Sequence, residues 1–113
     1  MSGNAEPTGP EIDNGIFATV YTDEFNLFGT DGNAGVVGFT PGSSDIVPSP
    51  GVTLKKILGP LKNNGGTTKT HALVGGSPAV NAVPSADPGC TGTDQRGKPR
   101  PHGPGCDIGA FER

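Results

Sequence analysis

The cysteines are the residues of this sequence whose chemistry is easiest to interpret. Cys90 and Cys106 flank a stretch rich in glycine and proline. Of the two histidines of the chain, His102 lies within this stretch and His71 lies before it. Two cysteines can form a disulfide, remain as free thiols, or join histidines around a metal. The spacing of these four residues fits no common zinc pattern. We therefore expect a disulfide, which would order a loop with little apolar surface, and no metal site.

The loop between the cysteines is bracketed by residues of opposite charge: Asp94, Arg96, Arg100 and Asp107. An arginine and a carboxylate can form a bidentate pair, and a pair between Arg96 and Asp107 would fix the loop against the end of the chain. Two carboxylates could also serve glycoside hydrolysis. No second motif builds a substrate cleft, so we interpret the four residues as a structural polar cluster and predict no catalytic residue.

The remaining polar motifs have ordinary structural interpretations. His71 stands alone beside an expected strand, and no serine or cysteine nucleophile occurs in a recognisable elbow. Asp31-Gly32-Asn33, with Asp23 and Glu24 upstream, is the only acidic group that could indicate calcium. The further acidic positions of an EF-hand loop and the repeated nonapeptide of calcium-binding β-rolls are missing. We therefore expect a turn at residues 31–33 and no cofactor, with calcium as the alternative.

The composition indicates a small domain with a thin core. Of 113 residues, 20 are glycine and 12 are proline, and only 31% are hydrophobic. The formal charge of −3 and the lack of a basic stripe argue against a nucleic-acid partner. No stretch is long and apolar enough for a transmembrane helix, and residues 1–10 have no apolar core of a signal peptide. A disulfide requires an oxidising compartment, so we expect the export signal to belong to a longer parent protein.

The elements that must position these residues are very short. Glycine and proline punctuate apolar clusters, which is typical of turn-rich β structure. We expect strands at residues 15–21, 25–28, 36–39, 71–74, 79–82 and 108–111. Leu54, Ile57, Leu58 and Leu61 have the spacing of a helical face, but Gly59-Pro60 interrupts it, so about one helical turn is expected over 53–58. The predicted class is all-β, with long loops.

Several motifs resemble, in their order and spacing, the C-terminal region of the choice-of-anchor Q proteins. These are bacterial surface or secreted proteins similar to the polymorphic outer-membrane and CSLREA-containing families. The motifs are residues 25–29 (FNLFG), 58–61 (LGPL), 64–66 (NGG), 70–73 (THAL), 76–80 (GSPAV), 93–97 (TDQRG), 100–101 (RP) and 106–112 (CDIGAFE). The resemblance covers roughly residues 15–113, and its last motif is long and specific.

The resemblance implies the terminal coils and C-terminal cap of a right-handed parallel β-helix. It places the last coils over residues 15–83 and a disulfide-stapled cap over 84–113. Residues 1–14, which are polar and contain Pro7 and Pro10, are expected to form a loose lead-in. The expected function is a non-catalytic structural cap of a secreted or cell-surface protein, with a parent that serves adhesion through surface glycans or host-surface components. The alternatives are a fragment of a β-helix enzyme similar to polysaccharide lyases, and a truncated reading frame without independent function.

Overall fold

The computed structural model describes residues 11–15 and 17–113, and the contacts divide the chain into two units. Unit 1 is Met1–Leu54 and unit 2 is Lys55–Arg113. The boundary expected between residues 83 and 84 falls inside a strand of unit 2. The lead-in expected over residues 1–14 lies outside the described residues except for 11–14.

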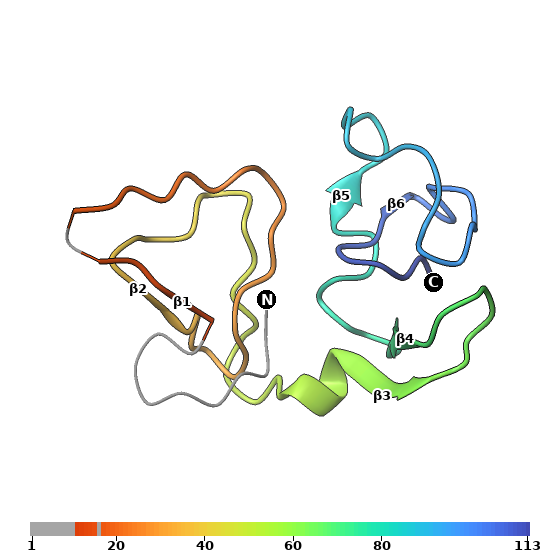
Figure 1. Cartoon of the computed structure of the whole chain (residues 1–113), viewed down its shortest axis with the longest axis horizontal. Coiled ribbons are helices and arrows are strands. Elements are labelled where there is room, and N and C mark those ends of the chain that lie inside the picture. Colours follow the sequence, from red (N-terminus) through yellow and green to blue (C-terminus); the bar gives the residue numbers. More distant parts are fainter. Residues whose placement is uncertain (1–10, 16) are drawn as a thin grey trace. The chain divides into compact units, whose positions relative to one another are not determined.

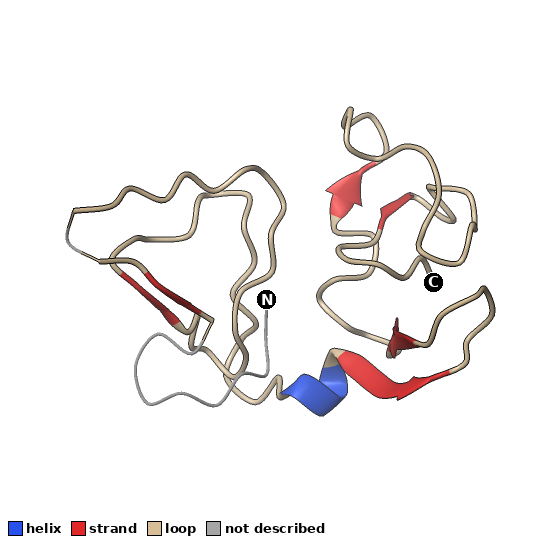
Figure 2. Ribbon diagram, viewed as in Figure 1, coloured by secondary structure: helices blue, strands red, loops and turns tan. Residues whose placement is uncertain are grey.

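Short strands and long loops make up the described part of the chain, with almost no helix (Figure 2). The strands are β1 (Ile12–Asp13), β2 (Val36–Val37), β3 (Leu58–Lys62), β4 (Thr70–Leu73), β5 (Val83–Pro84) and β6 (Gly105–Cys106). A 3₁₀ turn, η1, covers Leu54–Lys56 and lies within the helical turn expected over 53–58. The all-β class expected from the sequence agrees with this content.

Unit 1 contains two successive passes of the chain that pair in parallel (Figure 1). Strand β1 pairs with β2, so that Ile12 lies opposite Val36. Leu27 and Ile46 form a second parallel bridge, supported by the Ile46 amide, which donates to the Asn26 carbonyl over 2.7 Å. The sequence offset is 24 residues near the first pairing and 19 near the second. Both offsets join the same two passes, so the chain returns once to a parallel position alongside its earlier course.

The core of unit 1 is small and lies between the two passes. Leu27, Phe28 and Pro48 are buried. Phe28 packs edge-on against Phe39, with 5.9 Å between ring centroids. Gly38 approaches the first pass so closely that a Cβ built on it would lie 2.1 Å from the backbone oxygen of Asn14. A side chain at this position would therefore hold the two passes apart.

Unit 2 is built on antiparallel pairs. Strand β3 pairs with β4 with a register shift between Leu58 and Leu61, and β5 pairs with β6. The shift accommodates Pro60, which has no N–H to donate to a regular ladder. The buried residues of unit 2 are as often polar as apolar: Ile57, Leu73, Ala79, Cys90 and Cys106 against Thr70, Ser77, Asp94, Asp107 and Glu112. Buried polar contacts therefore contribute to holding unit 2 together, because its apolar core is thin.

Several expected strands are shorter than predicted or lie elsewhere. The described part of residues 15–21 contains no strand. The strand that pairs in parallel in this region is β1, which lies earlier in the chain. Residues 25–28 form only the bridge at Leu27, and 36–39 reduces to β2. Residues 79–82 and 108–111 are turns and bends, while β5 and β6 lie beside them. Strand β3 was missed because its leucines have helical spacing, and the prediction of β4 was correct within one residue.

Candidate functional site

The disulfide expected between Cys90 and Cys106 is present. The two sulfur atoms are 2.03 Å apart and both residues are buried. Cys106 belongs to β6, which pairs with β5, so the bridge ties the loop after β5 to the strand that follows the loop. This loop carries the polar cluster predicted from the sequence.

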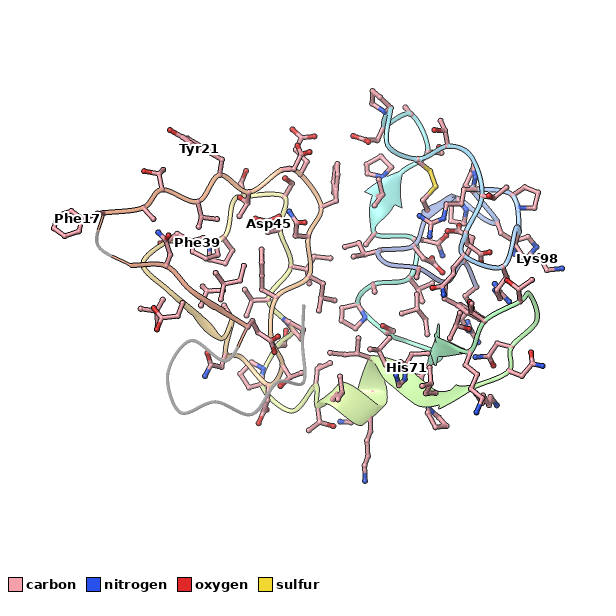
Figure 3. All side chains as sticks on the ribbon, in the orientation of Figure 1. Phe17, Tyr21, Phe39, Asp45, His71 and Lys98 are labelled. Carbon is pink, nitrogen blue, oxygen red and sulfur yellow. A yellow bond between two sulfur atoms is a disulfide. The ribbon has the colours of Figure 1, made fainter. Side chains whose placement is uncertain are left out.

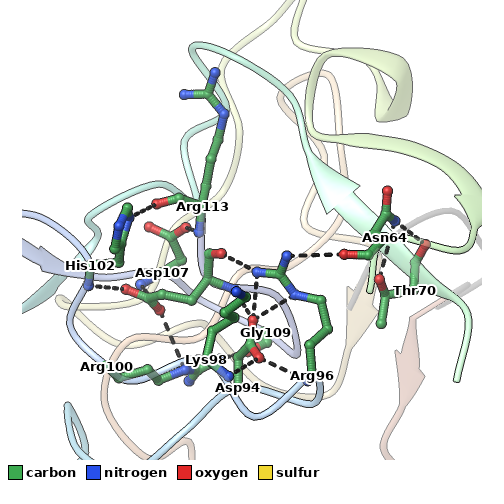
Figure 4. Close-up of polar contacts among 11 residues, drawn as sticks. Asn64, Thr70, Asp94, Arg96, Lys98, Arg100, His102, Asp107, Gly109 and Arg113 are labelled. Carbon is green, nitrogen blue, oxygen red and sulfur yellow. Dashed lines mark hydrogen bonds and ion pairs between the residues drawn. The ribbon is translucent and has the colours of Figure 1, made fainter. Parts of the chain in front are cut away.

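Asp94 is the centre of that cluster (Figure 4). Its side chain is fully shielded from solvent. Its carboxylate accepts the backbone N–H groups of Arg96 at 2.8 Å, Lys98 at 3.0 Å and Glu112 at 3.0 Å. It also forms an ion pair of 2.7 Å with the Arg96 guanidinium. One buried carboxylate thus closes the turn at residues 94–98 and attaches the chain end to it.

Arg96 extends this network in three directions. Besides Asp94, its guanidinium donates to the backbone oxygens of Asn64 and Glu112. Its Cζ lies 3.6 Å from the centre of the Phe111 ring, a cation–π contact. The pair expected between Arg96 and Asp107 is therefore replaced by the pair with Asp94. Arg96 connects the loop to the hairpin segment and to the last residues of the chain.

Glu112 also belongs to the cluster and was not predicted from the sequence. Its Oε1 accepts the His102 amide at 3.0 Å, its Oε2 accepts the Asp107 amide at 3.1 Å, and Arg100 Nε lies 3.3 Å from Oε2 as an ion pair. Glu112 is 3% exposed. A glutamate in a short glycine-rich tail usually stays solvated, so no sequence signal marks its burial.

Asp107 holds backbone groups of two segments. Its Oδ1 accepts the Asn81 amide and its Oδ2 accepts the Arg113 amide, each over 2.7 Å. Arg100 reaches the Gly109 carbonyl as well as Glu112. The structure thus brings together Asp94, Arg96, Arg100 and Asp107, with Glu112 and Phe111 added to them.

Hydrogen bonds lower the pKa values of two carboxylates, Asp94 and Asp45. Burial by itself would raise the pKa of Asp94, but the N–H groups of Glu112, Lys98 and Arg96 outweigh burial and hold that pKa far below its usual range. In unit 1, burial likewise acts to raise the pKa of Asp45, and hydrogen bonds from Asn26, Gly42 and Thr22 lower it. These are carboxylates held ionised, which suits a structural role better than proton transfer.

A pocket of about 380 Å³ lies beside the cluster. Its lining consists of Arg96, Lys98, Pro99, Pro101, His102, Phe111, Glu112 and Arg113. Lys98 and Arg113 are exposed, and Figure 3 shows Lys98 extending away from the ribbon. The His102 ring contacts the Arg113 carbonyl through Nδ1 at 3.2 Å. The pocket combines proline and phenylalanine rings with basic groups.

The other residues considered from the sequence contact backbone groups. His71 Nδ1 contacts the Gly59 carbonyl at 2.7 Å, across β3 and β4. The Asp31 carboxylate accepts the Gly51 amide, and Asp23 accepts the amide of Glu24. Among residues 11–15 and 17–113, no three acidic, histidine or cysteine side chains gather as metal ligands, and no helix could cross a membrane.

No protein-family model, curated protein or solved structure matches this chain.

Proposed function

We propose that this chain is a non-catalytic structural segment that ends a right-handed parallel β-helix. Unit 1 provides terminal coils and unit 2 provides the cap. The observation that carries the proposal is the parallel pairing in unit 1, with Ile12 opposite Val36 and Leu27 opposite Ile46. A β-helix is built from passes of the chain that return to parallel positions, and offsets of 24 and 19 residues are suitable coil lengths.

The character of unit 2 supports its assignment as a cap. Its strands pair antiparallel, and its loop over residues 91–105 is held by the disulfide and the carboxylate cluster. Such a unit offers no regular template for another parallel coil. An unpaired parallel edge attracts other chains, and ending the stack with an irregular, covalently closed unit prevents this.

The disulfide and the sequence resemblance support an exported parent protein. Disulfides persist mainly in oxidising compartments, and Cys90–Cys106 closes a loop that has few apolar side chains to order it. The resemblance to choice-of-anchor Q proteins adds a cell-surface location and a parent in adhesion or surface contact. In this proposal the chain provides architecture, and other coils of the parent provide recognition.

Nuclear magnetic resonance on the full chain tests the coil assignment. We expect long-range proton contacts between Ile12 and Val36 and between Leu27 and Ile46, in parallel register. Antiparallel contacts in residues 11–54, or an absence of protected amides there, would contradict it. Unprotected amides throughout the chain would favour a truncated product without independent structure.

Two further measurements test location and catalysis. Mass spectrometry of the protein from its native host should find Cys90 and Cys106 oxidised, and two free thiols would refute export. Incubation of the chain with polygalacturonate and with alginate should yield no new chain ends. Turnover that disappears on substitution of residues in this chain would favour the β-helix enzyme instead.

A further inference from the structure

We propose that Asn14 is a site of spontaneous deamidation, and that this modification loosens the pairing between the two passes of unit 1. The chain contains two Asn-Gly pairs, Asn14-Gly15 and Asn64-Gly65. Asparagine is a thermolabile residue, and a following glycine has no side chain to hinder attack by its backbone nitrogen. The structure favours reaction at the first pair over the second. The inference concerns the chemistry of unit 1 and does not depend on the function proposed above.

The reaction requires water and no other co-reactant. The backbone nitrogen of Gly15 attacks Cγ of the Asn14 side chain and forms a cyclic succinimide. The Cγ–Nδ2 bond breaks, and the side-chain nitrogen leaves as ammonia together with the proton of the Gly15 N–H. Water then opens the ring at one of its two carbonyl groups. The product at position 14 is aspartate or isoaspartate, according to which carbonyl group is attacked.

The backbone nitrogen of Gly15 is accessible for this attack. Gly15 is exposed, and within the described residues its N–H donates to no acceptor. A Cβ built on Gly15 would meet no heavy atom within 4 Å, so the space around it is open. The N–H of Gly65, by contrast, donates to Oδ1 of Asn63 over 3.0 Å. Only at the first pair is the attacking nitrogen without a hydrogen bond to release.

The side chain of Asn14 is also held less firmly than that of Asn64. Nδ2 of Asn14 donates to the carbonyl oxygens of Ala18 at 3.0 Å and Gly38 at 3.3 Å, and both bonds are exposed to solvent. Nδ2 of Asn64 donates to the carbonyl oxygen of Thr70 at 2.8 Å and to its hydroxyl at 3.1 Å, and both bonds are half-buried. Ring closure requires the side chain to leave these bonds, and a bond shielded from water costs more to break.

Deamidation at position 14 acts on the pairing because Asn14 lies at a contact between the two passes. Its backbone N–H donates to the Val37 carbonyl over 3.0 Å, and its side chain donates to the Gly38 carbonyl. A carboxylate has no proton to donate, so the product would face these carbonyl oxygens with negative charge. No lysine, arginine or histidine occurs in Met1–Leu54 to compensate that charge. Isoaspartate would in addition lengthen the backbone beside β1.

Incubation of the full chain in mildly alkaline buffer, followed by peptide mass spectrometry, tests the site. We expect deamidation at Asn14 to be at least about fivefold faster than at Asn64, the difference that roughly one hydrogen bond makes. In concentrated urea, where the fold is lost, the two asparagines should react at similar rates. Gly15→Ala is the matched control, because its Cβ has open space and should slow the reaction at Asn14 alone.

A variant that reproduces the product tests the consequence for the fold. The Ile12 N–H donates to the Gly35 carbonyl across the two passes. Asn14→Asp should therefore speed amide exchange at Ile12 at least about fivefold. Asn64→Asp makes the same chemical change in unit 2 and should leave exchange at Ile12 unchanged.

Four outcomes would overturn the proposal. These are no deamidation at Asn14, a rate at Asn64 that equals or exceeds it in the folded chain, a difference that persists in urea, and unchanged exchange at Ile12 in Asn14→Asp. The third would assign the selectivity to neighbouring residues in sequence rather than to the fold. All four concern the modification, whereas the coil assignment fails only if the unmodified chain lacks the parallel pairing of Ile12 with Val36.

Discussion

The backbone N–H of Glu112 donates to the buried carboxylate of Asp94 over 3.0 Å, which attaches the end of the chain to a turn 18 residues earlier. The same carboxylate pairs with Arg96, whose guanidinium in turn reaches the Glu112 carbonyl. Three buried acidic residues, Asp94, Asp107 and Glu112, organise unit 2 through backbone N–H groups. In a unit with few large apolar side chains, these bonds select one arrangement of loops that are otherwise rich in glycine.

Asp94→Asn should destabilise unit 2 by about 3 kcal/mol, because it removes one charge of a buried ion pair and leaves Arg96 uncompensated. Urea unfolding at neutral pH measures the loss. Asp87→Asn is the control, since the amide oxygen can still accept the Gly89 N–H and residue 87 forms no ion pair in the described part of the chain. Equal losses in the two variants would show that the Asp94 network adds no stability of its own.

Stability should fall in acid. The pKa of Asp94 is lower in the folded chain than the value of about 3.9 for an unfolded aspartate, so the folded state binds fewer protons. Its contribution is complete above the unfolded value and is lost as the pH falls below about 4 toward the lower folded pKa. The lowered pKa of Asp45 has the same sign in unit 1.

Unfolding free energies measured at several values between about pH 7 and about pH 2 should therefore decline at the acidic end. Asp94→Asn should flatten the part of this decline that belongs to unit 2. A variant that shows the full wild-type slope would place the acid sensitivity at other carboxylates.

Removing the disulfide should cost unit 2 about 3 kcal/mol, because Cys90 and Cys106 close a loop with a sequence separation of 16. Cys90→Ser with Cys106→Ser should speed amide exchange first in β6, which contains Cys106, and in β5, which pairs with β6. A reductant should destabilise the wild type and leave the double variant unchanged. Unchanged exchange in these strands would mean that the polar cluster alone orders the loop.

Gly38→Ala should destabilise unit 1 more than Gly51→Ala does. Both glycines have positive φ, 81° and 86°, so each alanine meets a backbone strain of about 1–2 kcal/mol. Only Gly38 has a neighbour where the Cβ would be, the Asn14 oxygen at 2.1 Å, whereas a Cβ on Gly51 meets nothing within 4 Å. Thermal unfolding should show an additional loss of about 1–3 kcal/mol for Gly38→Ala. Equal losses would argue against close stacking of the two passes.

Local signals predicted the parts of the fold that depend on neighbours in sequence. The turn around Asp31 and Gly32, the short η1 turn before Gly59-Pro60, and β4 all follow from turn chemistry or a local apolar cluster. The pairing partners of the strands could not be predicted from such local signals. Strands of two residues carry no periodicity, so nothing in the sequence of β5 or β6 distinguishes them from the neighbouring turns.

Phe17 and Tyr21 show the same difference between local pattern and tertiary outcome. Their spacing and their β propensity predicted a strand, yet they are 99% and 90% exposed and point away from the ribbon in Figure 3. Phe39, by contrast, packs against Phe28. Propensity describes what suits a half-buried sheet, and only contact with a second segment makes that sheet.

The sequence by itself determined the β-rich class, the near absence of helix and the two cysteines that form the bridge, because these depend on composition and on the number of residues available for each role. Only the tertiary structure decided that Arg96 pairs with Asp94, that Glu112 is buried, and that Phe111 and Lys98 border one pocket. Ion pairs and pockets depend on which segments lie next to each other in space. Glycine-rich loops can adopt many arrangements, and the buried carboxylates and the disulfide select one of them.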